Sequence, residues 1–485
     1  MNGVLVYEIL YVIVLVSVCT RIIYDTNTST KALAYLLLVI FLPIVGIIFY
    51  FSFGINHHKR KIYSKKLFRD DAFENKIIDE ILQSSRCNFE HGGETIKPYK
   101  ELAYMLAKNN KSALTANNYV KLLVNGENKF PEVLRVLESA QNHIHIEYYI
   151  YEDDEIGRAI EQVLIKKAKE GVAVRFIYDD FGSHPIRRIL VGRLRVAGVK
   201  VFPFYKMTFL ALGIRLNYRN HRKIIVVDGH TAFVGGINVS DKYVNKPGNE
   251  KKLFWRDTHL LIKGSGVLYL QYLFLSDWNF CAKDNLQPDE IFFPRSASLP
   301  VADQKMVQIA GSGPDSDTPA VLFSMLQAIN LATEEILITT PYFIPGESIL
   351  DAMVIASLGG VSVKLLVPGI SDSRIVNAAA GSYYGELLDA GVEIYRYRKG
   401  FVHAKTMVVD KKVAIVGTAN MDARSFDLNF EVNAIVYNEE LASELSNVFY
   451  EDIKDAEKID AGKWKLRPWH KQLAEKTARL VSPLL

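Results

Sequence analysis

Two long apolar runs open the chain and are separated by a short polar stretch. They cover Val4 to Tyr24 and Ala32 to Phe53, and each is close to the ~20 residues that an α-helix needs to cross a bilayer core. We therefore predict a transmembrane hairpin over residues 1–56. A cleavable signal peptide is the alternative for the first run. That run lacks a basic start and a small-residue cleavage site, and a second apolar run follows it directly.

Basic residues gather after the second apolar run. They are His57 to Lys61 (HHKRK), Lys65, Lys66 and Arg69, whereas the loop between the runs offers only Arg21 and Lys31. Because positive charge collects on the cytoplasmic side of a membrane protein, we predict a multi-pass protein of the cell inner (plasma) membrane with its remaining domains in the cytoplasm. The basic stretch lies in a juxtamembrane connector over residues 57–115. It either holds anionic headgroups or acts only as a topology signal.

The rest of the chain alternates strand and helix patterns, and it does so twice in the same order. The first series is a helix at 130–140, a strand at 143–151, a helix at 156–169, a strand at 172–178, a helix at 185–196 and a strand at 198–204. The second is a helix at 319–332, a strand at 335–342, a helix at 347–358, a strand at 361–367, a helix ending near 388 and a strand at 390–397. Such alternation predicts an α/β fold.

Short phrases match between the two series. EGVAVRF (170–176) corresponds to GGVSVKL (359–365), and AGVKVFPF corresponds to AGVEIYRY. The repeated unit is too long for a solenoid. We therefore predict an internal duplication that gives two packed α/β domains, over residues 116–300 and 301–485.

Each predicted domain ends its series with one polar phrase. HRKIIVVD occupies 221–228 and HAKTMVVD occupies 403–410, and both continue to a glycine and an asparagine at the same spacing, H-x-K-x4-D-x6-G-[GT]-x-N. The motif residues are His221, Lys223, Asp228, Gly235, Gly236 and Asn238 in the first copy, and His403, Lys405, Asp410, Gly417, Thr418 and Asn420 in the second. A single histidine or lysine is most often structural, but a complete duplicate of the whole set favours a function.

The apolar centre of each phrase predicts a strand, in which residues two apart share a face. His221 and Lys223 should then point the same way, as should His403 and Lys405. We expect the glycines to allow close approach to a ligand and Asn238 and Asn420 to supply amide donors. Asp228 and Asp410, which belong to the same motifs, fall at the strand ends and suit a structural role.

Two such faces brought together would hold two imidazoles, two ammonium groups and two amides. This set suits a phosphodiester: cations and amides stabilise the charge of a phosphorane-like transition state, one imidazole attacks phosphorus, and the other donates a proton to the leaving oxygen. Each imidazole also needs an acidic partner to fix its tautomer. The corresponding positions Asp257 (WRD) and Glu431 (NFE) are our candidates.

Composition limits the alternatives. The 485 residues are 49% hydrophobic and 23% charged, with mean hydropathy +0.06, and the apolar excess lies in the two N-terminal runs. A net charge of +4 does not indicate a nucleic-acid partner. Three scattered cysteines predict neither a disulfide framework nor a zinc site, and we expect no metal and no cofactor.

The two motifs, HRKIIVVD…GGIN and HAKTMVVD…GTAN, resemble those of the phospholipase D superfamily. Further phrases, LPIVGIIFYFSFG, IEYYIYEDDEIG, WRDTHLLIKGSGV, ITTPYFIP and ARLVSPLL, resemble the bacterial cardiolipin synthases of that superfamily over essentially the whole chain. The resemblance implies two packed phospholipase D-like domains. It also implies a phosphatidyltransferase that converts two phosphatidylglycerol molecules in the membrane to cardiolipin and glycerol through a phosphohistidine intermediate.

By analogy with that family, His221 is the nucleophile and His403 the acid. The chain departs from the family motif at Gly236 and Thr418, where serine is frequent, and this puts one hydroxyl contact to phosphate in doubt. An insertion at 205–217 contains Met207, Phe209 and Leu210. It would either reach between acyl chains or form an ordinary buried helix.

Other functions use the same motifs. A hydrolytic phospholipase D accepts water in place of a lipid hydroxyl, and other phosphatidyltransferases accept a different alcohol. A phosphodiesterase nuclease is disfavoured by the apolar hairpin and the near-neutral charge, and a non-catalytic membrane scaffold is disfavoured by two complete motifs. Acyl-chain and donor headgroup preference and the oligomeric state stay open.

Overall fold

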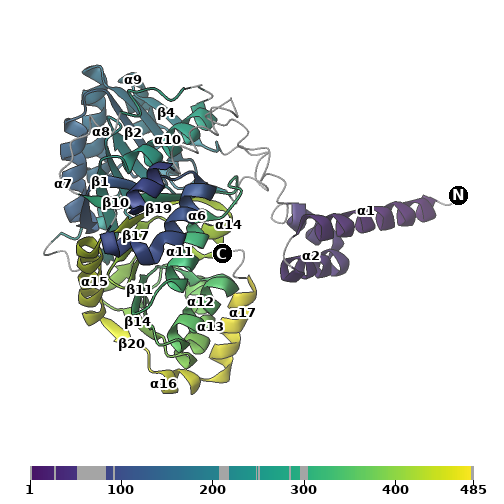
Figure 1. The fold of residues 1–485 in the computed structure, drawn as a ribbon. Coiled ribbons are helices and arrows are strands. Elements are labelled where there is room, and N and C mark those ends of the chain that lie inside the picture. The colour runs from purple at the N-terminus through teal and green to yellow at the C-terminus, as the bar shows by residue number, and fades with distance from the viewer. Residues whose placement is uncertain are drawn as a thin grey trace.

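A computed structural model describes residues 3–26, 29–51, 83–90, 93–206, 218–246, 248, 252–282, 284, 286–294 and 304–481 of the chain. Figure 1 shows a body built from a long sheet and its covering helices, with α1 and α2 lying side by side outside it. The basic residues at 57–69 and most of the 205–217 insertion lie outside the described residues.

The N-terminal apolar runs form three helices instead of two. They are α1 (Gly3–Asp25), α2 (Ser29–Phe41) and α3 (Pro43–Phe49). Leu42 leaves the helical conformation (φ −133°, ψ 69°), because the proline that follows disfavours helical geometry at the residue before it. Gly46 of α3 then turns back onto α2, so closely that an added Cβ would lie 2.6 Å from the Cα of Val39.

Only the first of these helices is long enough to span a bilayer. Among the described residues, one helix qualifies by length and composition, over Leu5–Asp25 with a mean hydropathy of 2.1. The expected second span is therefore broken into two shorter helices in the structure, and the multi-pass arrangement stays a prediction.

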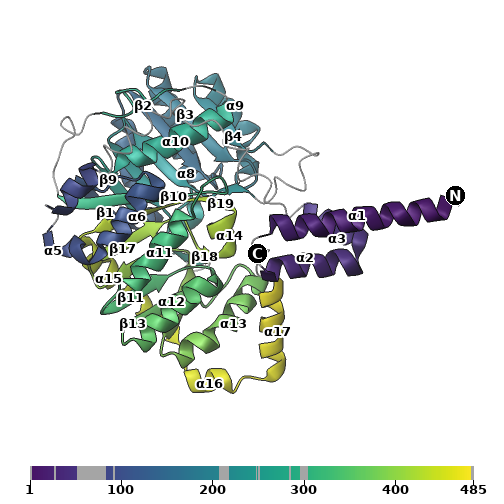
Figure 2. The ribbon, with the colours of Figure 1, turned by 45° about the vertical axis from the view of Figure 1, so that its right-hand side comes forward.

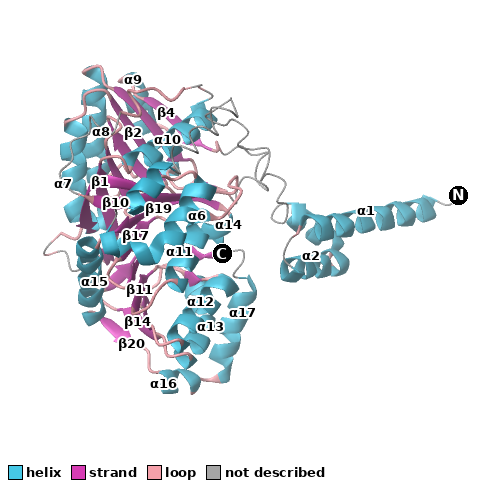
Figure 3. Cartoon of the chain, in the orientation of Figure 1, coloured by secondary structure: helices cyan, strands magenta, loops and turns pink. Residues whose placement is uncertain are grey.

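One 16-stranded sheet runs through the body. The first half supplies β1 (Thr115–Val124), β2 (His143–Tyr148), β3 (Ala173–Asp179), β4 (Lys200–Phe204), β5 (Arg219–Asn220), β6 (Lys223–Val227), β7 (Thr231–Gly235) and β9 (Thr258–Lys263). The second half supplies β10 (Lys305–Ser312), β11 (Glu335–Thr339), β13 (Ser362–Pro368), β14 (Glu393–Tyr397), β16 (Thr406–Val409), β17 (Val413–Gly417), β19 (Asn429–Tyr437) and β20 (Ala456–Lys458). Figure 3 shows the strands as a continuous layer between helices.

The strand order reveals the duplication. From the centre outward, the first half reads β1-β9-β7-β6-β2-β3-β4 and the second reads β10-β19-β17-β16-β11-β13-β14, with β1 and β10 antiparallel at the junction. The pairs β2–β3, β3–β4, β11–β13 and β13–β14 are parallel, as strands joined by a crossover helix are, and β20 pairs antiparallel with β14 at the edge. The predicted α/β duplication is thus confirmed.

Helices cover both faces of the sheet. In the first half α7 (Asn125–Glu138), α8 (Glu155–Lys169) and α9 (Ile189–Val196) bury one face. In the second half α11 (Ala320–Asn330), α12 (Gly346–Leu358) and α13 (Arg374–Asp389) do the same. A third core under α10 (Val267–Ala282) and α15 (Glu439–Lys454) contains strands of both halves, so the halves share one continuous interior.

The segment before β1 belongs structurally to the second half. Its helix α6 (Lys100–Asn110) buries Leu102 and Leu106 in the same core as Ile336 and Leu365. The stretch that the sequence suggested as a connector therefore supplies part of a folded core.

Strand β17 packs closely against β19 at Gly417. A Cβ at Gly417 would lie 1.9 Å from Asn433 Oδ1 and 2.5 Å from the carbonyl oxygen of Val432. We expect Gly417→Ala to lower the free energy of unfolding by ~1–3 kcal/mol through overpacking, measured by thermal or denaturant unfolding. Gly385→Ala in α13 is the matched control. Its Cβ meets nothing within 4 Å, and helix propensity should stabilise it by up to about 1 kcal/mol. Equal effects of both changes would contradict the packing argument.

Candidate active site

The two motif histidines sit just before strands, held by the opposite half of the chain. The strands begin at Lys223 and Thr406, so the expectation that the histidines lie within them is off by a few residues. The backbone N–H of His221 donates to the carbonyl of Phe430 (3.0 Å), and that of His403 donates to the carbonyl of Arg256 (2.7 Å). Each histidine is therefore positioned by the other repeat.

Two short parallel strand pairs hold each histidine segment against the opposite half. β5 (Arg219–Asn220) pairs with the start of β19, and β15 (Gly400–Val402) pairs with β8 (Phe254–Arg256). The pairs are equivalent in the duplicated fold. They bring the segment before each motif against the part of the other half that carries an acidic residue, which lies within β19 or directly after β8.

The acidic residues contact the histidines in a crossed pattern. His221 Nδ1 lies 2.9 Å from both carboxylate oxygens of Glu431, and His403 Nδ1 lies 2.7 Å from Asp257 Oδ2. Both carboxylates are fully buried. A carboxylate at Nδ1 fixes the proton there and leaves Nε2 with the lone pair, the state that a nucleophile or base requires.

Both imidazoles open into one cavity. It has a volume of about 380 Å³ and is lined by His221, His403, Asn238, Asn420 and aromatic, cationic and acidic side chains from both halves. Histidines that are remote in the chain thus share one space at the junction of the repeats, as the phosphodiester hypothesis requires.

The lysines of the motifs lie buried directly behind the histidines. Lys223 Nζ donates to the carbonyl oxygen of His221 (2.7 Å), and Lys405 Nζ donates to that of His403 (2.5 Å). Burial lowers the pKa of Lys223 to about 7, with Lys405 adding to the effect and Glu431 opposing it. Burial likewise lowers the pKa of Lys405 to about 8. Both lysines are buried and neither is among the residues that line the cavity, but their positive charge, poorly screened by solvent, attracts an anion beside the histidines.

Burial also keeps both imidazoles neutral near pH 7. It lowers the pKa of His221 to about 4 and that of His403 to about 3, and the charge of Lys405 adds to the effect at His403. A neutral imidazole is ready to attack. A bound phosphate supplies negative charge beside the ring that must donate a proton, which raises the pKa of that ring.

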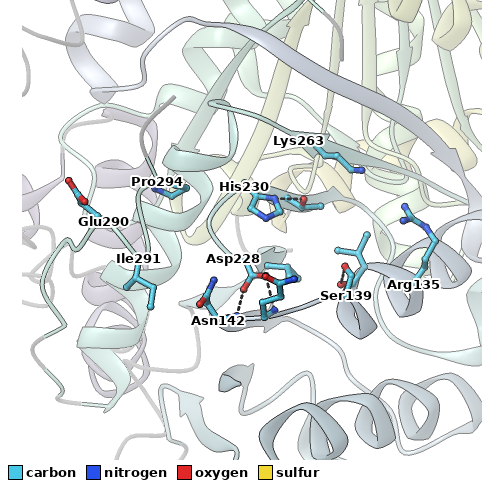
Figure 4. A pocket seen from close by; sticks show the side chains of 13 residues that line it. Arg135, Ser139, Asn142, Asp228, His230, Lys263, Glu290, Ile291 and Pro294 are labelled. Atoms are coloured by element: carbon cyan, nitrogen blue, oxygen red, sulfur yellow. Dashed lines mark hydrogen bonds between the residues drawn. The ribbon is translucent and has the colours of Figure 1, made fainter. Parts of the chain in front are cut away.

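The motif aspartates lie elsewhere, at the opposite ends of the strands. Asp228 accepts backbone N–H groups of Gln141, Asn142 and His143 at 2.8–2.9 Å. Figure 4 shows Asp228 beside Asn142 in a second pocket. This pocket shares no lining residue with the cavity of His221 and His403. Asp410 binds three backbone N–H groups in the same way, at 333–335, and accepts the Tyr99 hydroxyl. The structure places both aspartates away from the cavity that His221 and His403 line. Their grouping with the catalytic residues of the motifs and their structural role both stay predictions.

The glycines serve the packing of strands and carboxylates. A Cβ at Gly235 would lie 2.6 Å from the Cα of His259, and one at Gly236 would lie 2.2 Å from Asp257 Oδ1. At the position equivalent to Gly236, the Thr418 hydroxyl donates to Glu431. The glycines thus make room for neighbouring chain atoms rather than for a ligand, and the hydroxyl at this position contacts the carboxylate.

The amides line the cavity but already have protein partners. Asn238 Nδ2 donates to the Tyr243 hydroxyl (2.9 Å), and Asn420 Nδ2 lies 3.2 Å from Asp422 Oδ2. Asn420 Oδ1 is buried and has no hydrogen-bond partner. Each Nδ2 carries a second N–H besides the one that contacts the protein, so the expectation that these amides donate to a ligand stays a prediction.

Several residues that line the cavity were not predicted from the sequence. The cations are Arg219, Lys242 and Arg424, and the aromatic groups include Tyr149, Trp255 and Tyr342. Tyr149 packs edge-on to the His221 ring and Trp255 packs against the His403 ring. Tyr149 and Trp255 stand in phrases already quoted, yet nothing in their spacing marks them as part of the site.

Comparison with known proteins places this geometry in a family. The family described as "Cardiolipin synthase, PLD-like domain" matches residues 133–261 and again 325–453, and "Phospholipase_D-nuclease N-terminal" matches residues 9–54. A cardiolipin synthase of Halalkalibacterium halodurans is 40% identical over 99% of this chain and 94% of its own length. The chain belongs to the cardiolipin synthase family.

Other members and one solved structure agree. The major cardiolipin synthase of Bacillus subtilis is 38% identical over 95% of each chain. The crystal structure of a phosphatidylserine synthase from Haemophilus influenzae superposes with a TM-score of 0.59 at 13% identity, covering 81% of this chain and all of that one. The solved structure supports the shared fold, and the cardiolipin synthase relatives span the N-terminal helices as well as both halves.

The crossed contacts predict that charge removal at either carboxylate disables its histidine. We expect Glu431→Gln and Asp257→Asn each to lower kcat by roughly 10²–10⁴-fold, the range of a general acid–base contribution, because the imidazole loses its fixed tautomer. Steady-state kinetics with a phospholipid substrate measures this. Asp228→Asn is the control, because that carboxylate holds a turn: it should lower thermal stability and leave kcat per folded molecule near that of the unchanged protein. A large kcat loss in the control would return Asp228 to the catalytic set.

The lowered pKa values predict a bell-shaped pH profile of kcat/KM, which reports the free enzyme. The neutral imidazole of His221 is lost as pH falls through about 4, and the ammonium of Lys223 is lost as pH rises through about 7. His403 has a pKa of about 3 in the free protein and must take up a proton as the phosphate binds, so kcat/KM should fall with rising pH already below neutrality. We expect this alkaline limb to steepen near neutrality, where Lys223 loses its charge. The arginine in Lys223→Arg keeps its charge at these pH values. In this variant the steep part of the alkaline limb should shift from about pH 7 toward pH 8, where Lys405 loses its charge. An alkaline limb that begins above pH 10 in the unchanged protein would contradict this electrostatic picture.

Proposed function

We propose that this chain is a cardiolipin synthase, which transfers a phosphatidyl group between two phosphatidylglycerol molecules and releases glycerol. The proposal rests on one observation above all: the two motif histidines line a single cavity, each with a buried carboxylate at Nδ1. Relatives named cardiolipin synthase that match nearly the whole chain support the choice of substrate.

The first half-reaction forms a covalent intermediate. Nε2 of His221 attacks the phosphorus of one phosphatidylglycerol, the bond from phosphorus to the glycerol oxygen breaks, and protonated His403 gives its proton to that oxygen. Lys223 and Lys405 stabilise the negative charge that develops on the non-bridging oxygens. Glycerol leaves, and the phosphatidyl group remains on His221.

The second half-reaction reverses the roles of acid and base. His403, now neutral, removes the proton from a glycerol hydroxyl of a second phosphatidylglycerol. The freed oxygen attacks phosphorus and the phosphorus–nitrogen bond breaks, which gives cardiolipin and restores both histidines. Glu431 and Asp257 stabilise whichever imidazole carries positive charge.

The membrane supplies both substrates. The apolar helix α1 supports association with a membrane, so that lipids reach the site by lateral diffusion within one leaflet. We place the catalytic halves on the cytoplasmic side of the inner membrane, which is supported by the basic residues that follow the second apolar run.

Product analysis tests the proposal. The purified full-length protein, given phosphatidylglycerol alone, should yield cardiolipin and glycerol in equal amounts. His221→Ala and His403→Ala should abolish turnover, and Lys223→Ala or Lys405→Ala should lower it by at least about 10²–10³-fold. Phosphatidic acid as the main product would identify a hydrolase instead, and turnover in either histidine variant would refute the shared site.

Chemical trapping tests the order of the two histidines. A rapid denaturing quench at alkaline pH, followed by peptide mapping, should find the phosphatidyl label on the peptide that contains His221. Label on His403 would reverse the assigned roles without changing the overall reaction.

A further inference from the structure

The C-terminal helix α17 (Trp469–Val481) lies against α13 and runs antiparallel to it. Lys465, just before α17, forms a salt bridge with Asp389 at the end of α13 (2.7 Å), and Glu475 packs beside Gly381. The end of α17 is therefore directed toward the start of α13. Ser373 and Val376, at that start, line the cavity that holds the two histidines. Figure 2 shows α17 along the edge of the body, next to α13.

The outer face of α17 is apolar. Trp469, Leu473 and Leu480 keep 74%, 54% and 80% of their surfaces exposed. At 100° per residue these three lie within about 40° of one another around the helix axis. Ala478 and Glu475, by contrast, face the body and are partly buried. A surface helix normally turns its apolar stripe inward, so α17 is oriented the opposite way.

The charges of α17 also differ between its two sides. The only acidic residue of the helix, Glu475, accepts a bidentate pair from Arg467 (2.6 and 2.9 Å) and faces the body. Lys471 and Lys476 are exposed. At 100° per residue Lys476 borders the apolar stripe, whereas Lys471 lies on the other side of the helix. The outer surface thus combines apolar side chains with the positive charge of Lys476, the combination by which helices lie in the headgroup region of anionic membranes.

We propose that α17 lies flat on the anionic surface of the membrane and holds the cavity mouth at the lipid headgroups. The proposal deepens the proposed function and rests on it, because it assigns the surface from which a lipid substrate would enter. Ile370 and Ile375 beside the start of α13 are exposed at 43% and 54%. They extend the apolar surface from the end of α17 toward the cavity.

A second copy of the chain fits this surface less well. Two α17 helices facing each other in a symmetric dimer would bring the two copies of Lys476 into one interface, because such an interface places one patch against itself. An anionic bilayer attracts Lys476 instead. The charge pattern therefore favours a lipid surface over self-association.

Fluorescence quenching tests where Trp469 lies. The full-length protein is placed in nanodiscs whose acyl chains carry bromine, and the signal of Trp469 is taken as the difference between the unchanged protein and Trp469→Phe. We expect bromolipid to quench this signal strongly in phosphatidylglycerol discs and more weakly in phosphatidylcholine discs, and the bilayer to shield it from aqueous acrylamide. Full acrylamide quenching without bromolipid quenching would overturn the proposal. Shielding from both quenchers that disappears on dilution would overturn it in favour of self-association.

Kinetics with phosphatidylglycerol in bilayers and in dispersed form tests whether α17 helps the protein reach lipids in a membrane. Leu473→Gln combined with Leu480→Gln should raise the apparent KM for phosphatidylglycerol in bilayers by about tenfold or more, and should leave kcat on dispersed short-chain phosphatidylglycerol unchanged. Ile189→Gln with Val196→Gln is the matched control, since these α9 side chains are also exposed, at 64% and 92%. The control should behave like the unchanged protein.

The outcomes separate the two proposals. Equal loss of activity on both substrate forms, or equal effects of the α17 and α9 pairs, would refute a membrane role for α17. Absence of cardiolipin with the unchanged protein would refute the proposed function, while the bromolipid measurement, which needs no turnover, would still report the position of Trp469.

Discussion

The exchange of carboxylates between the two halves is the constraint on which the site depends. Glu431 contacts His221 and Asp257 contacts His403, so each histidine takes its carboxylate partner from the other half. Burying these carboxylates without partners would be costly. They are compensated by the imidazoles and by Lys223 and Lys405, which are buried beside them. The charges of the site are therefore balanced only when the two halves are docked. The site and the interface between the halves must form together.

The symmetry of the site is incomplete. In the second repeat the Thr418 hydroxyl and the Asn429 amide both donate to Glu431, whereas Gly236 offers no side chain at the place equivalent to Thr418. Asp257 relies instead on the backbone N–H of Thr258 (2.7 Å). The two histidines therefore have unequal supporting contacts.

Much of this arrangement could be predicted from the sequence. The duplicated strand and helix patterns predicted the α/β halves, and the correspondence of WRD with NFE identified Asp257 and Glu431. Sequence correspondence cannot tell which carboxylate meets which histidine, because both repeats offer the same choice. The docking of β5 on β19 and of β15 on β8 decides it. The motif pattern placed Asp228 at a strand end, but it could not predict which backbone groups its carboxylate binds, since that contact depends on the fold of residues 141–143.

The position of α6 bears on the order in which the chain becomes structured during synthesis. Its apolar side chains precede the whole first half in sequence, yet they complete a core formed by residues beyond 320. As the nascent chain leaves the ribosome, the first half can collapse while α6 still lacks the strands it will cover. The exposed helix must then be kept from misassociating for the time needed to translate some 200 further residues. An early membrane anchor, by tethering that nascent segment beside the bilayer, would limit the partners it meets.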